Sequence, residues 1–155
     1  MGDSHKRRAA GEALELDRQL CFLLYGASRA VTQAYQPLLA PLGLTYPQYL
    51  VMLVLWETDG VSVGTLCDRL YLDSGTLTPL ITRLETAGLV ERARSRTDAR
   101  VVDVHLTTAG RRLERAAARV PEALLCRLGV DATQLPRIHH ELKQLFDLVT
   151  KEKAA

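Results

Sequence analysis

The chain has 155 residues, of which 47% are hydrophobic and 25% are charged, with a formal net charge of +2. These values are typical of a single globular domain with a real core and exclude a largely disordered chain. The small net charge does not by itself indicate a nucleic-acid partner, so the distribution of charge matters more than its sum.

The N-terminal part is predicted to contain a mobile tail at residues 1–11 and a long helix from about Leu14 to Leu38. The tail is polar and small, whereas apolar residues recur at helical spacing after Leu14. Pro37 marks the approach of the helix end, and residues 38–44 contain the proline and glycine of a connection.

A second helix is predicted from Tyr46 to Thr58. Thr45 occupies the N-cap position and Gln48 follows three residues later, which is the pattern of a capping box. Pro47 lies in the first turn, where proline is tolerated. Because this helix is apolar on nearly every side, we expect it at the centre of the core.

Two short helices are predicted next. The first spans residues 63–70 behind Ser62 as its N-cap, with an apolar stripe at helical spacing. The second spans residues 74–87, and either Asp73 or Ser74 can cap it. Two short helices joined by a tight turn are typical of a helix-turn-helix.

Two strands, 89–94 and 101–106, are predicted around the turn 95–100. Residues 91–100 contain four arginines and two acids, a local excess of two positive charges. The order of elements predicts a mainly α fold, a winged helix-turn-helix with a two-stranded β-wing over residues 45–106. Such a module indicates DNA binding.

Two further helices are predicted at residues 107–128 and 133–151, each beginning near a threonine. Together with the first helix they carry apolar stripes that one small winged core cannot cover. We therefore expect residues 12–44 and 107–153 to form the dimerisation region of a homodimer. A two-fold axis would place two recognition helices on a palindromic double-stranded operator.

The tip of the 74–87 helix is expected to enter the major groove, where short hydroxyls can bond phosphates or base edges. Arg100 is expected to insert into the minor groove, with Asp98 holding its guanidinium; alternatively, both are simply hairpin-turn residues. The residues predicted to bind DNA are Ser74, Thr76, Thr78, Arg83, Arg92, Arg94, Asp98 and Arg100.

The longest apolar run, residues 49–56, is too short to span a bilayer, and no apolar stretch follows the basic residues 6–8. We therefore expect a cytoplasmic protein without a membrane partner, whose three cysteines stay reduced. Their spacing fits no zinc site, and the adjacent His139 and His140 point about 100° apart on a helix. Neither a metal nor another cofactor is expected.

Cys21 shares a helical stripe with Tyr25 and Tyr35, and Tyr46 begins the next helix. The residue types alone favour core packing. Three phenols around one thiol would nevertheless stabilise a thiolate, because each hydroxyl can donate a hydrogen bond to S⁻. A thiolate reacts with a peroxide to give a sulfenic acid, which a second thiol can trap as a disulfide.

Three motifs resemble the OhrR branch of the MarR family, whose members are repressors that sense organic hydroperoxides. They are LCFLLY at 20–25, YPQYL at 46–50 and LYLDSGTLTP at 70–79, and the similarity extends over about residues 16–148. The resemblance implies a dimeric, mostly helical winged-helix repressor.

The resemblance also implies roles for the thiols. The peroxidatic cysteine of the family falls on Cys21, and the tyrosines that hydrogen-bond to it fall on Tyr25, Tyr35 and Tyr46, some of them across the dimer interface. One subtype adds a resolving cysteine from the partner chain, and Cys126 lies at that position, although it could also be a buried helix cysteine. Cys67 lies on a buried stripe and is interpreted as core.

The function implied is that of a repressor that an organic hydroperoxide releases from its operator, by oxidation of Cys21 and an intersubunit disulfide with Cys126. Two alternatives stay open. A regulator of the same fold could respond to a bound phenolic ligand. A thiol peroxidase could use the two cysteines for turnover, but the winged module would then have no purpose, so we expect no enzyme.

Overall fold

The computed structural model describes residues 14–95 and 98–151, so the tail predicted at residues 1–11 lies outside the described residues. The helices and strands follow one another in the order η1 (Leu16–Arg18), α2 (Leu20–Leu39), η2 (Ala40–Leu42), α3 (Tyr46–Glu57), β1 (Val61–Ser62), α4 (Val63–Leu70), α5 (Ser74–Thr86), β2 (Val90–Arg94), β3 (Val102–Leu106), α6 (Thr108–Ala117), α7 (Val120–Leu128) and α8 (Leu135–Lys151).

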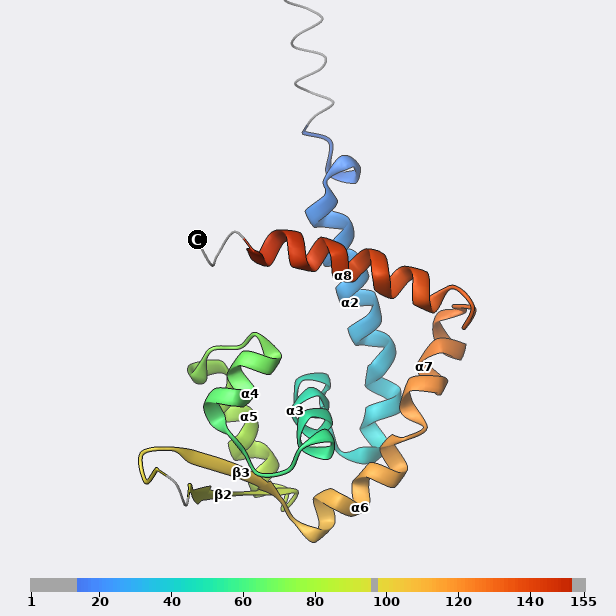
Figure 1. Cartoon of the computed structure of the whole chain (residues 1–155). Helices are drawn as coiled ribbons and strands as arrows, with labels where there is room; N and C mark the ends of the chain where they lie inside the picture. Colours follow the sequence, from blue (N-terminus) through green and yellow to red (C-terminus); the bar gives the residue numbers. More distant parts are fainter. Residues whose placement is uncertain (1–13, 96–97, 152–155) are drawn as a thin grey trace, which may run out of the picture.

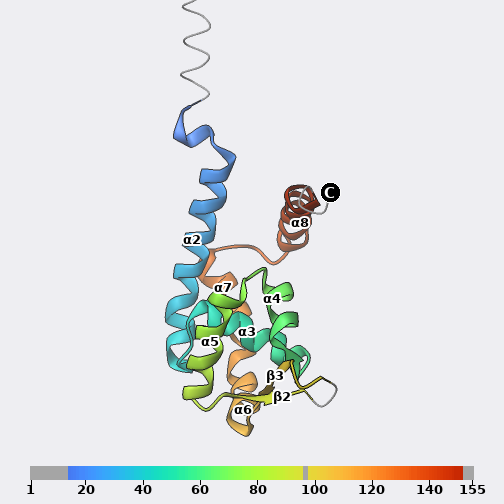
Figure 2. The ribbon, with the colours of Figure 1, turned by 90° about the vertical axis from the view of Figure 1, so that its left-hand side faces the viewer.

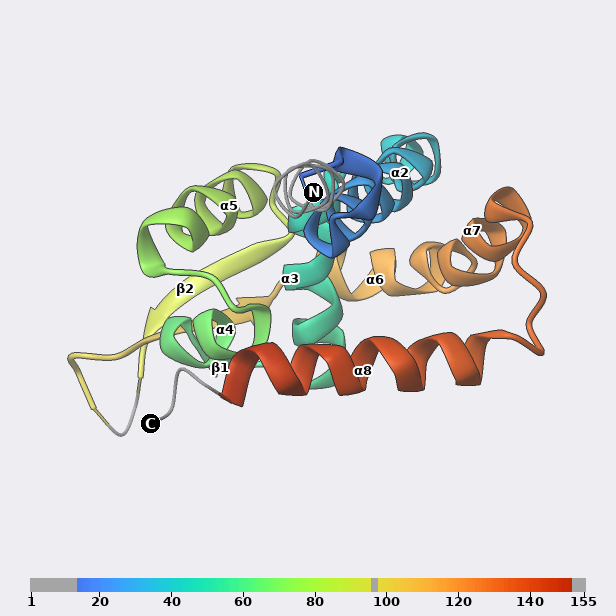
Figure 3. The same cartoon turned by 90° about the horizontal axis from the view of Figure 1, so that it is seen from above.

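The winged helix-turn-helix prediction is confirmed. Helix α3 lies at the centre of the module, with α4 and α5 packed against it and the β2–β3 hairpin beside them (Figure 3). Its side chains are buried on several faces, as its uniformly apolar sequence predicts. The fully buried side chains of this core include Val51, Met52, Leu55, Leu66, Leu77, Ile81, Leu84 and Val104.

The caps that begin these helices are those that the sequence predicts. The Thr45 amide donates to Gln48 Oε1 at 2.8 Å in a capping box. Ser62 Oγ accepts from the Thr65 amide at 3.0 Å and so begins α4. Local hydrogen bonds therefore fix where the winged module's helices start.

The sheet has three strands rather than the two that were predicted. Strand β1 pairs antiparallel with β3, with Val61 opposite Val104, in the order β1-β3-β2. A strand of two residues is too short to show alternation, and only its pairing with a distant strand defines it. The third strand anchors the wing to the start of α4.

The helix predicted at residues 107–128 is in fact two helices, α6 and α7. Pro121 lies in the first turn of α7, where it has no amide hydrogen for the carbonyl four residues earlier. The α-helix therefore stops at Ala117 and begins again at Val120. The first predicted helix also starts later, at Leu20, because Gln19 adopts an extended conformation after η1.

The helices outside the winged module are arranged loosely. Helix α2 rises from the module, α7 packs along it, and α8 crosses the front of α2 (Figures 1 and 2). At its far end α8 meets the turn between α4 and α5, where the rings of Tyr71 and Phe146 lie 4.8 Å apart. Large apolar side chains on α2 and α8 stay exposed, among them Leu20, Leu23, Leu142 and Val149.

Within the described residues, no single helix is long and apolar enough to cross a membrane. The segments 20–42 and 46–57, bent by 69° at their junction, meet the criterion of length and composition only as a pair.

Candidate nucleic-acid interface and thiol site

The N-terminus of α5 is capped by a carboxylate. Asp73 Oδ1 accepts from the Thr76 amide at 2.9 Å, and Thr76 Oγ1 donates to Asp73 Oδ2 at 2.8 Å. These bonds from Thr76 lower the pKa of Asp73 below its ordinary value. Because a carboxylate already occupies this helix end, a phosphate would be repelled there, and Thr76 can offer DNA only its lone pairs and its methyl group.

The other polar side chains predicted on α5 are exposed. Thr78 Oγ1 donates to the Ser74 carbonyl at 2.7 Å, so this hydroxyl is free to accept a further hydrogen bond. Ser74 and Arg83 also lie on the exposed side of the helix. The geometry of α5 thus presents short hydroxyls near its start and one guanidinium near its end.

Asp98 and Arg100 are paired on the wing. The Arg100 amide donates to Asp98 Oδ1 at 2.9 Å, and Arg100 Nε lies 3.5 Å from the same oxygen. The Arg100 side chain is 93% exposed. An ion pair this exposed contributes little to the stability of the fold. Its effect is to orient the Arg100 side chain. Arg96 and Thr97, between the strands, lie outside the described residues.

Arg92 has a different environment from the other wing arginines. Its Nε and Nη2 donate to Glu85 Oε2 at 3.0 and 2.6 Å, and its amide donates to Glu85 Oε1 at 3.2 Å. Glu85 was not predicted as part of the site, because its partner Arg92 lies beyond the end of α5 and the following turn, on strand β2. The only signal in the sequence was an acidic residue near the end of a predicted helix, seven residues before an arginine of the next predicted strand.

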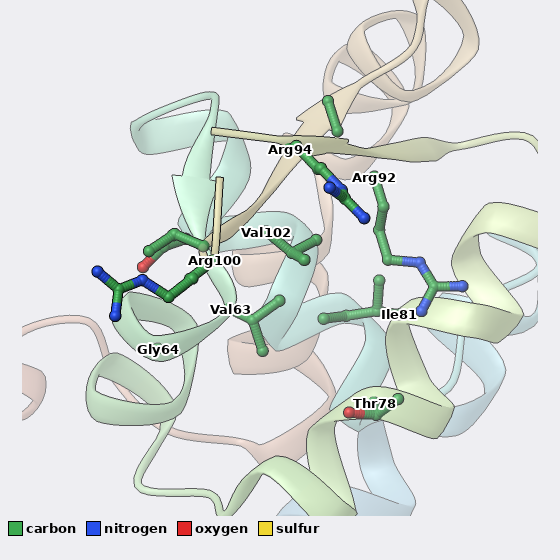
Figure 4. Close-up of a pocket in the computed structure, with 11 residues that line it drawn as sticks. Val63, Gly64, Thr78, Ile81, Arg92, Arg94, Arg100 and Val102 are labelled. Carbon is green, nitrogen blue, oxygen red and sulfur yellow. The ribbon is translucent and has the colours of Figure 1, made fainter. Parts of the chain in front are cut away.

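A cleft of about 670 Å³ separates α5 from the wing (Figure 4). Val63, Ile81 and Val102 form its apolar floor. Arg92 and Arg94 approach the cleft from one side and Arg100 from the other. Helices α4 and α5 and the wing therefore border one concave surface that carries three arginines.

Replacing Arg100 with alanine should weaken DNA binding by about 1–3 kcal/mol, the range for one good base or groove contact. Folding should not change, because the side chain is 93% exposed. Titration of a labelled duplex at several salt concentrations measures the effect, and circular dichroism checks the fold. Unchanged affinity at every salt concentration would remove Arg100 from the interface.

Cys21 lies in the first turn of α2 and is exposed. Tyr25 follows one helical turn later and is also exposed. Arg29 Nη1 donates to the Tyr25 hydroxyl at 3.4 Å, and its guanidinium carbon lies 5.6 Å from the centre of that ring. The Tyr25 hydroxyl hydrogen thus stays free to be donated to another acceptor.

Three other tyrosines cluster at the opposite end of α2. The Tyr35 ring lies 4.7 Å from the Tyr46 ring and 5.8 Å from the Tyr49 ring, between ring centres. Burial, followed by the neighbouring Tyr46 and Tyr49, raises the pKa of Tyr35 to about 12. Burial also raises the pKa of Tyr46. Both phenols therefore keep their protons at neutral pH and can act as hydrogen-bond donors.

The structure does not bring Cys21 to Tyr35 within one chain. The two residues are 14 positions apart on one helix, which is about 21 Å at 1.5 Å per residue. Tyr49 was not predicted as a member of the tyrosine cluster, because α3 is apolar on every side and no single face stands out in its sequence.

All three cysteines are free thiols. Cys126 lies in the last turn of α7 and is exposed, not buried as its alternative interpretation requires. Cys67 is half-buried on α4 and packs against the core cluster. Cys126 is therefore more accessible than Cys67, which the core partly covers.

A family profile described as "Transcriptional regulator SarA/Rot" matches residues 33–116. The chain is 48% identical to the organic hydroperoxide resistance transcriptional regulator of Bacillus subtilis over 112 residues, 72% of this chain and 76% of that protein. It is 59% identical to the HTH-type transcriptional regulator TtmR of Methylorubrum extorquens over 99 residues, 64% of this chain, and spans 51% of that protein.

Among solved structures, the chain resembles AbfR of Staphylococcus epidermidis in three states. The reduced form bound to DNA is 35% identical, with a TM-score of 0.72 over 90% of this chain and 98% of that one. The overoxidized form, also bound to DNA, has the same identity and coverage and a TM-score of 0.71. The disulfide form is 34% identical, with a TM-score of 0.61 over 96% and 99% of the chains.

Proposed function

The chain belongs to the MarR family of winged-helix, DNA-binding transcriptional regulators, and from this premise we propose that it is a repressor released from its operator when an organic hydroperoxide oxidises Cys21. The DNA contacts would come from Ser74, Thr78 and Arg83 on α5 and from Arg94 and Arg100 on the wing. The active species would be a homodimer on a palindromic duplex.

One observation carries this proposal: the exposed thiol of Cys21 and the half-buried tyrosine pair, Tyr35 and Tyr46, lie near opposite ends of α2. Cys21 is in the first turn of α2, and Tyr35 is in its last two turns beside Tyr46. Two copies of α2 that run antiparallel would bring Cys21 of one subunit to Tyr35 and Tyr46 of the other. The two-fold axis would then pass near residue 28, midway between positions 21 and 35.

The exposed apolar surface supports this dimer. A hollow of about 480 Å³ opens between α2, α8 and the α4–α5 turn, lined by Leu24, Tyr71, Leu142 and Phe146, among others. Exposed apolar side chains gathered in one hollow are typical of an interface between subunits. A second copy of the chain would cover it, and the interface would join the thiol region to the turn that precedes α5.

The proposed chemistry is a stoichiometric signal. The Cys21 thiolate attacks one peroxide oxygen, the O–O bond breaks, and the departing alkoxide takes a proton to leave as an alcohol. The resulting sulfenic acid is attacked by the Cys126 thiol of the other subunit, which forms the S–S bond and releases water. Phenol donors from Tyr25, Tyr35 and Tyr46 would stabilise the thiolate before the attack.

The three AbfR structures support the disulfide, rather than oxidation alone, as the event that releases DNA. AbfR is described bound to DNA both when reduced and when overoxidized. An added oxygen on one sulfur need not move a helix, whereas a disulfide requires Cα atoms about 4.4–6.8 Å apart. In this chain such an approach would shift α2 and α7, and with them the spacing of the two recognition helices.

Operator binding before and after treatment with cumene hydroperoxide tests the proposal. A duplex selected in vitro by the reduced protein should bind the oxidised wild type at least about tenfold more weakly, equivalent to about 1.4 kcal/mol. Cys21→Ser should bind the duplex equally before and after treatment. Cys67→Ala is the matched control and should respond as the wild type does.

Two other outcomes would replace the proposal. Release that persists in Cys21→Ser would contradict thiol sensing and favour a regulator with a bound phenolic ligand as its trigger. Repeated turnover of hydroperoxide with an external reductant would favour a thiol peroxidase.

A further inference from the structure

Glu85 and Arg92 join the end of the recognition helix to the first strand of the wing. Glu85 is in the last turn of α5, and Arg92 is the third residue of β2. Both carboxylate oxygens are engaged: one accepts from the Arg92 amide at 3.2 Å, and the other accepts from Nε and Nη2 at 3.0 and 2.6 Å. Three bonds between one pair of residues fix direction as well as distance.

The arginine of this ion pair is more shielded than the arginines of the other ion pairs in the described part of the chain. The Arg92 side chain is 34% exposed and that of Glu85 36%. The arginines of the other described ion pairs are 46–93% exposed. The hydrogen bonds from Arg92 also hold the pKa of Glu85 below its ordinary value, so the carboxylate is charged at neutral pH.

Arg94 differs from Arg92 although both lie on the same face of β2, two residues apart. Within residues 14–95 and 98–151, the Arg94 side chain forms no hydrogen bond or ion pair. Figure 4 shows its guanidinium directed into the cleft between the wing and α5. A phosphate in the cleft could therefore pair with Arg94 without breaking any existing bond.

The same phosphate could not recruit Arg92 as easily. Moving the guanidinium would break two side-chain bonds to Glu85, and it would leave an unpaired carboxylate facing the negatively charged DNA. Binding therefore favours the arrangement in which Arg92 stays on Glu85 and only Arg94 turns to the DNA.

We propose that Glu85 and Arg92 are positioning residues, which set the angle between the recognition helix and the wing, and that Arg94 is the arginine of this strand that contacts a DNA phosphate. The cleft that this pair holds open is bordered by Thr78 on α5 and by Arg94 and Arg100 on the wing. Specific binding needs helix and wing in two grooves at once, so a small change in their angle misplaces one of them. The proposal rests on DNA binding by the family and not on peroxide sensing.

Removal of the Glu85 charge should change DNA affinity in opposite directions for the two possible roles of Arg92. If Arg92 were a DNA contact restrained by Glu85, Glu85→Gln would free it and tighten binding. If the pair positions the helix, Glu85→Gln should weaken specific binding about three- to tenfold, although it removes a negative charge near DNA. Glu91→Gln is the matched control, an exposed acid on the same strand, and should leave binding unchanged or slightly tighter.

The salt dependence separates the two arginines. With the reduced protein and the selected duplex, Arg94→Ala should lower the slope of log K against log salt by about 0.9, the value for one phosphate contact. Arg92→Ala should weaken binding but keep the wild-type slope. A constant fraction of inactive protein does not change the slope, and circular dichroism over the same salt range checks that the folded fraction is constant.

Two further measurements complete the test. Glu85→Gln should leave binding to an unrelated duplex unchanged or slightly tighter, since non-specific binding is electrostatic and the substitution removes a negative charge. The double variant Glu85→Gln/Arg92→Ala should bind no more weakly than Arg92→Ala alone. Tighter binding by Glu85→Gln than by Glu91→Gln, or a slope lowered by Arg92→Ala, would overturn the proposal. A reduced protein that bound no selected duplex would instead contradict the DNA-binding function itself.

Discussion

Replacement of Gly110 by alanine is expected to lower the free energy of unfolding by about 3 kcal/mol, the upper range for adding atoms to a packed site. A Cβ at this position would overlap the Leu89 carbonyl oxygen and lie 3.2 Å from Leu106 Cδ2. The first is a backbone atom, so no side-chain rotation can relieve the contact.

The surroundings of Gly110 cannot easily give way. The Leu89 carbonyl accepts from the Thr107 amide at 3.1 Å and from Thr107 Oγ1 at 3.2 Å. On the other side, Trp56 Nε1 donates to the Gly110 carbonyl at 3.0 Å. Movement of α6 away from β2 would therefore break bonds that tie this helix to the wing and to the central helix.

Urea unfolding of the reduced protein, followed by circular dichroism at one fixed protein concentration, measures this effect. Gly64→Ala is the control, because its Cβ would meet only Ser62 Oγ at 3.7 Å, an ordinary contact. The control should unfold at the same urea concentration as the wild type or slightly higher, since alanine is the better helix former. A Gly110→Ala midpoint equal to that of the control would contradict the packing argument.

Features encoded by neighbouring residues could be predicted from the sequence. At two helix caps, a side-chain oxygen accepts a hydrogen bond from the amide three residues later. Ser62 accepts from Thr65, and Thr107 accepts from Gly110. The order of helices and strands in the winged module follows from the same local signals. The break before α7 also has a local signal, because Pro121 has no amide hydrogen to continue the helix, although one continuous helix was predicted there.

Features that depend on folding over longer distances could not be predicted. Strand β1 has only two residues and exists because β3 pairs with it. The Glu85–Arg92 pair spans a helix end, a turn and a strand, so no periodicity marks it. The shared stripe of Cys21 and Tyr35 suggested one cluster, but helical rise places them about 21 Å apart within a chain. A stripe shows which face residues share, not how close they lie.

The Cys126→Ser variant is expected to form no covalent dimer after treatment with hydroperoxide, whereas the wild type should run as a dimer on a non-reducing gel. Cys126 is exposed in the last turn of α7, and Cys67 packs against the core of the winged module. Cys67 is thus the less accessible thiol, since it is half-buried on α4. The Cys67→Ala variant should therefore give the wild-type band.

Oxidation of Cys21 itself should persist in Cys126→Ser, because the attack on the peroxide needs only the first thiol. A sulfenic-acid probe such as dimedone should label the variant strongly and Cys21→Ser not at all. Without a resolving thiol, the sulfenic acid is open to further oxidation to the sulfinic state, which ordinary reductants do not reverse. After prolonged exposure to hydroperoxide, dithiothreitol should therefore not restore the Cys21 thiol of Cys126→Ser. In the wild type, dithiothreitol should restore this thiol fully.

The same variant separates oxidation from release of the operator. If helix movement driven by the disulfide opens the dimer, Cys126→Ser should keep operator binding within about twofold of its reduced value, a difference below about 0.5 kcal/mol. Loss of binding by Cys126→Ser together with dimedone labelling would show that oxidation of Cys21 alone is enough. A covalent dimer that persists in Cys126→Ser would instead remove Cys126 from the resolving role, because some other thiol must then supply the second sulfur.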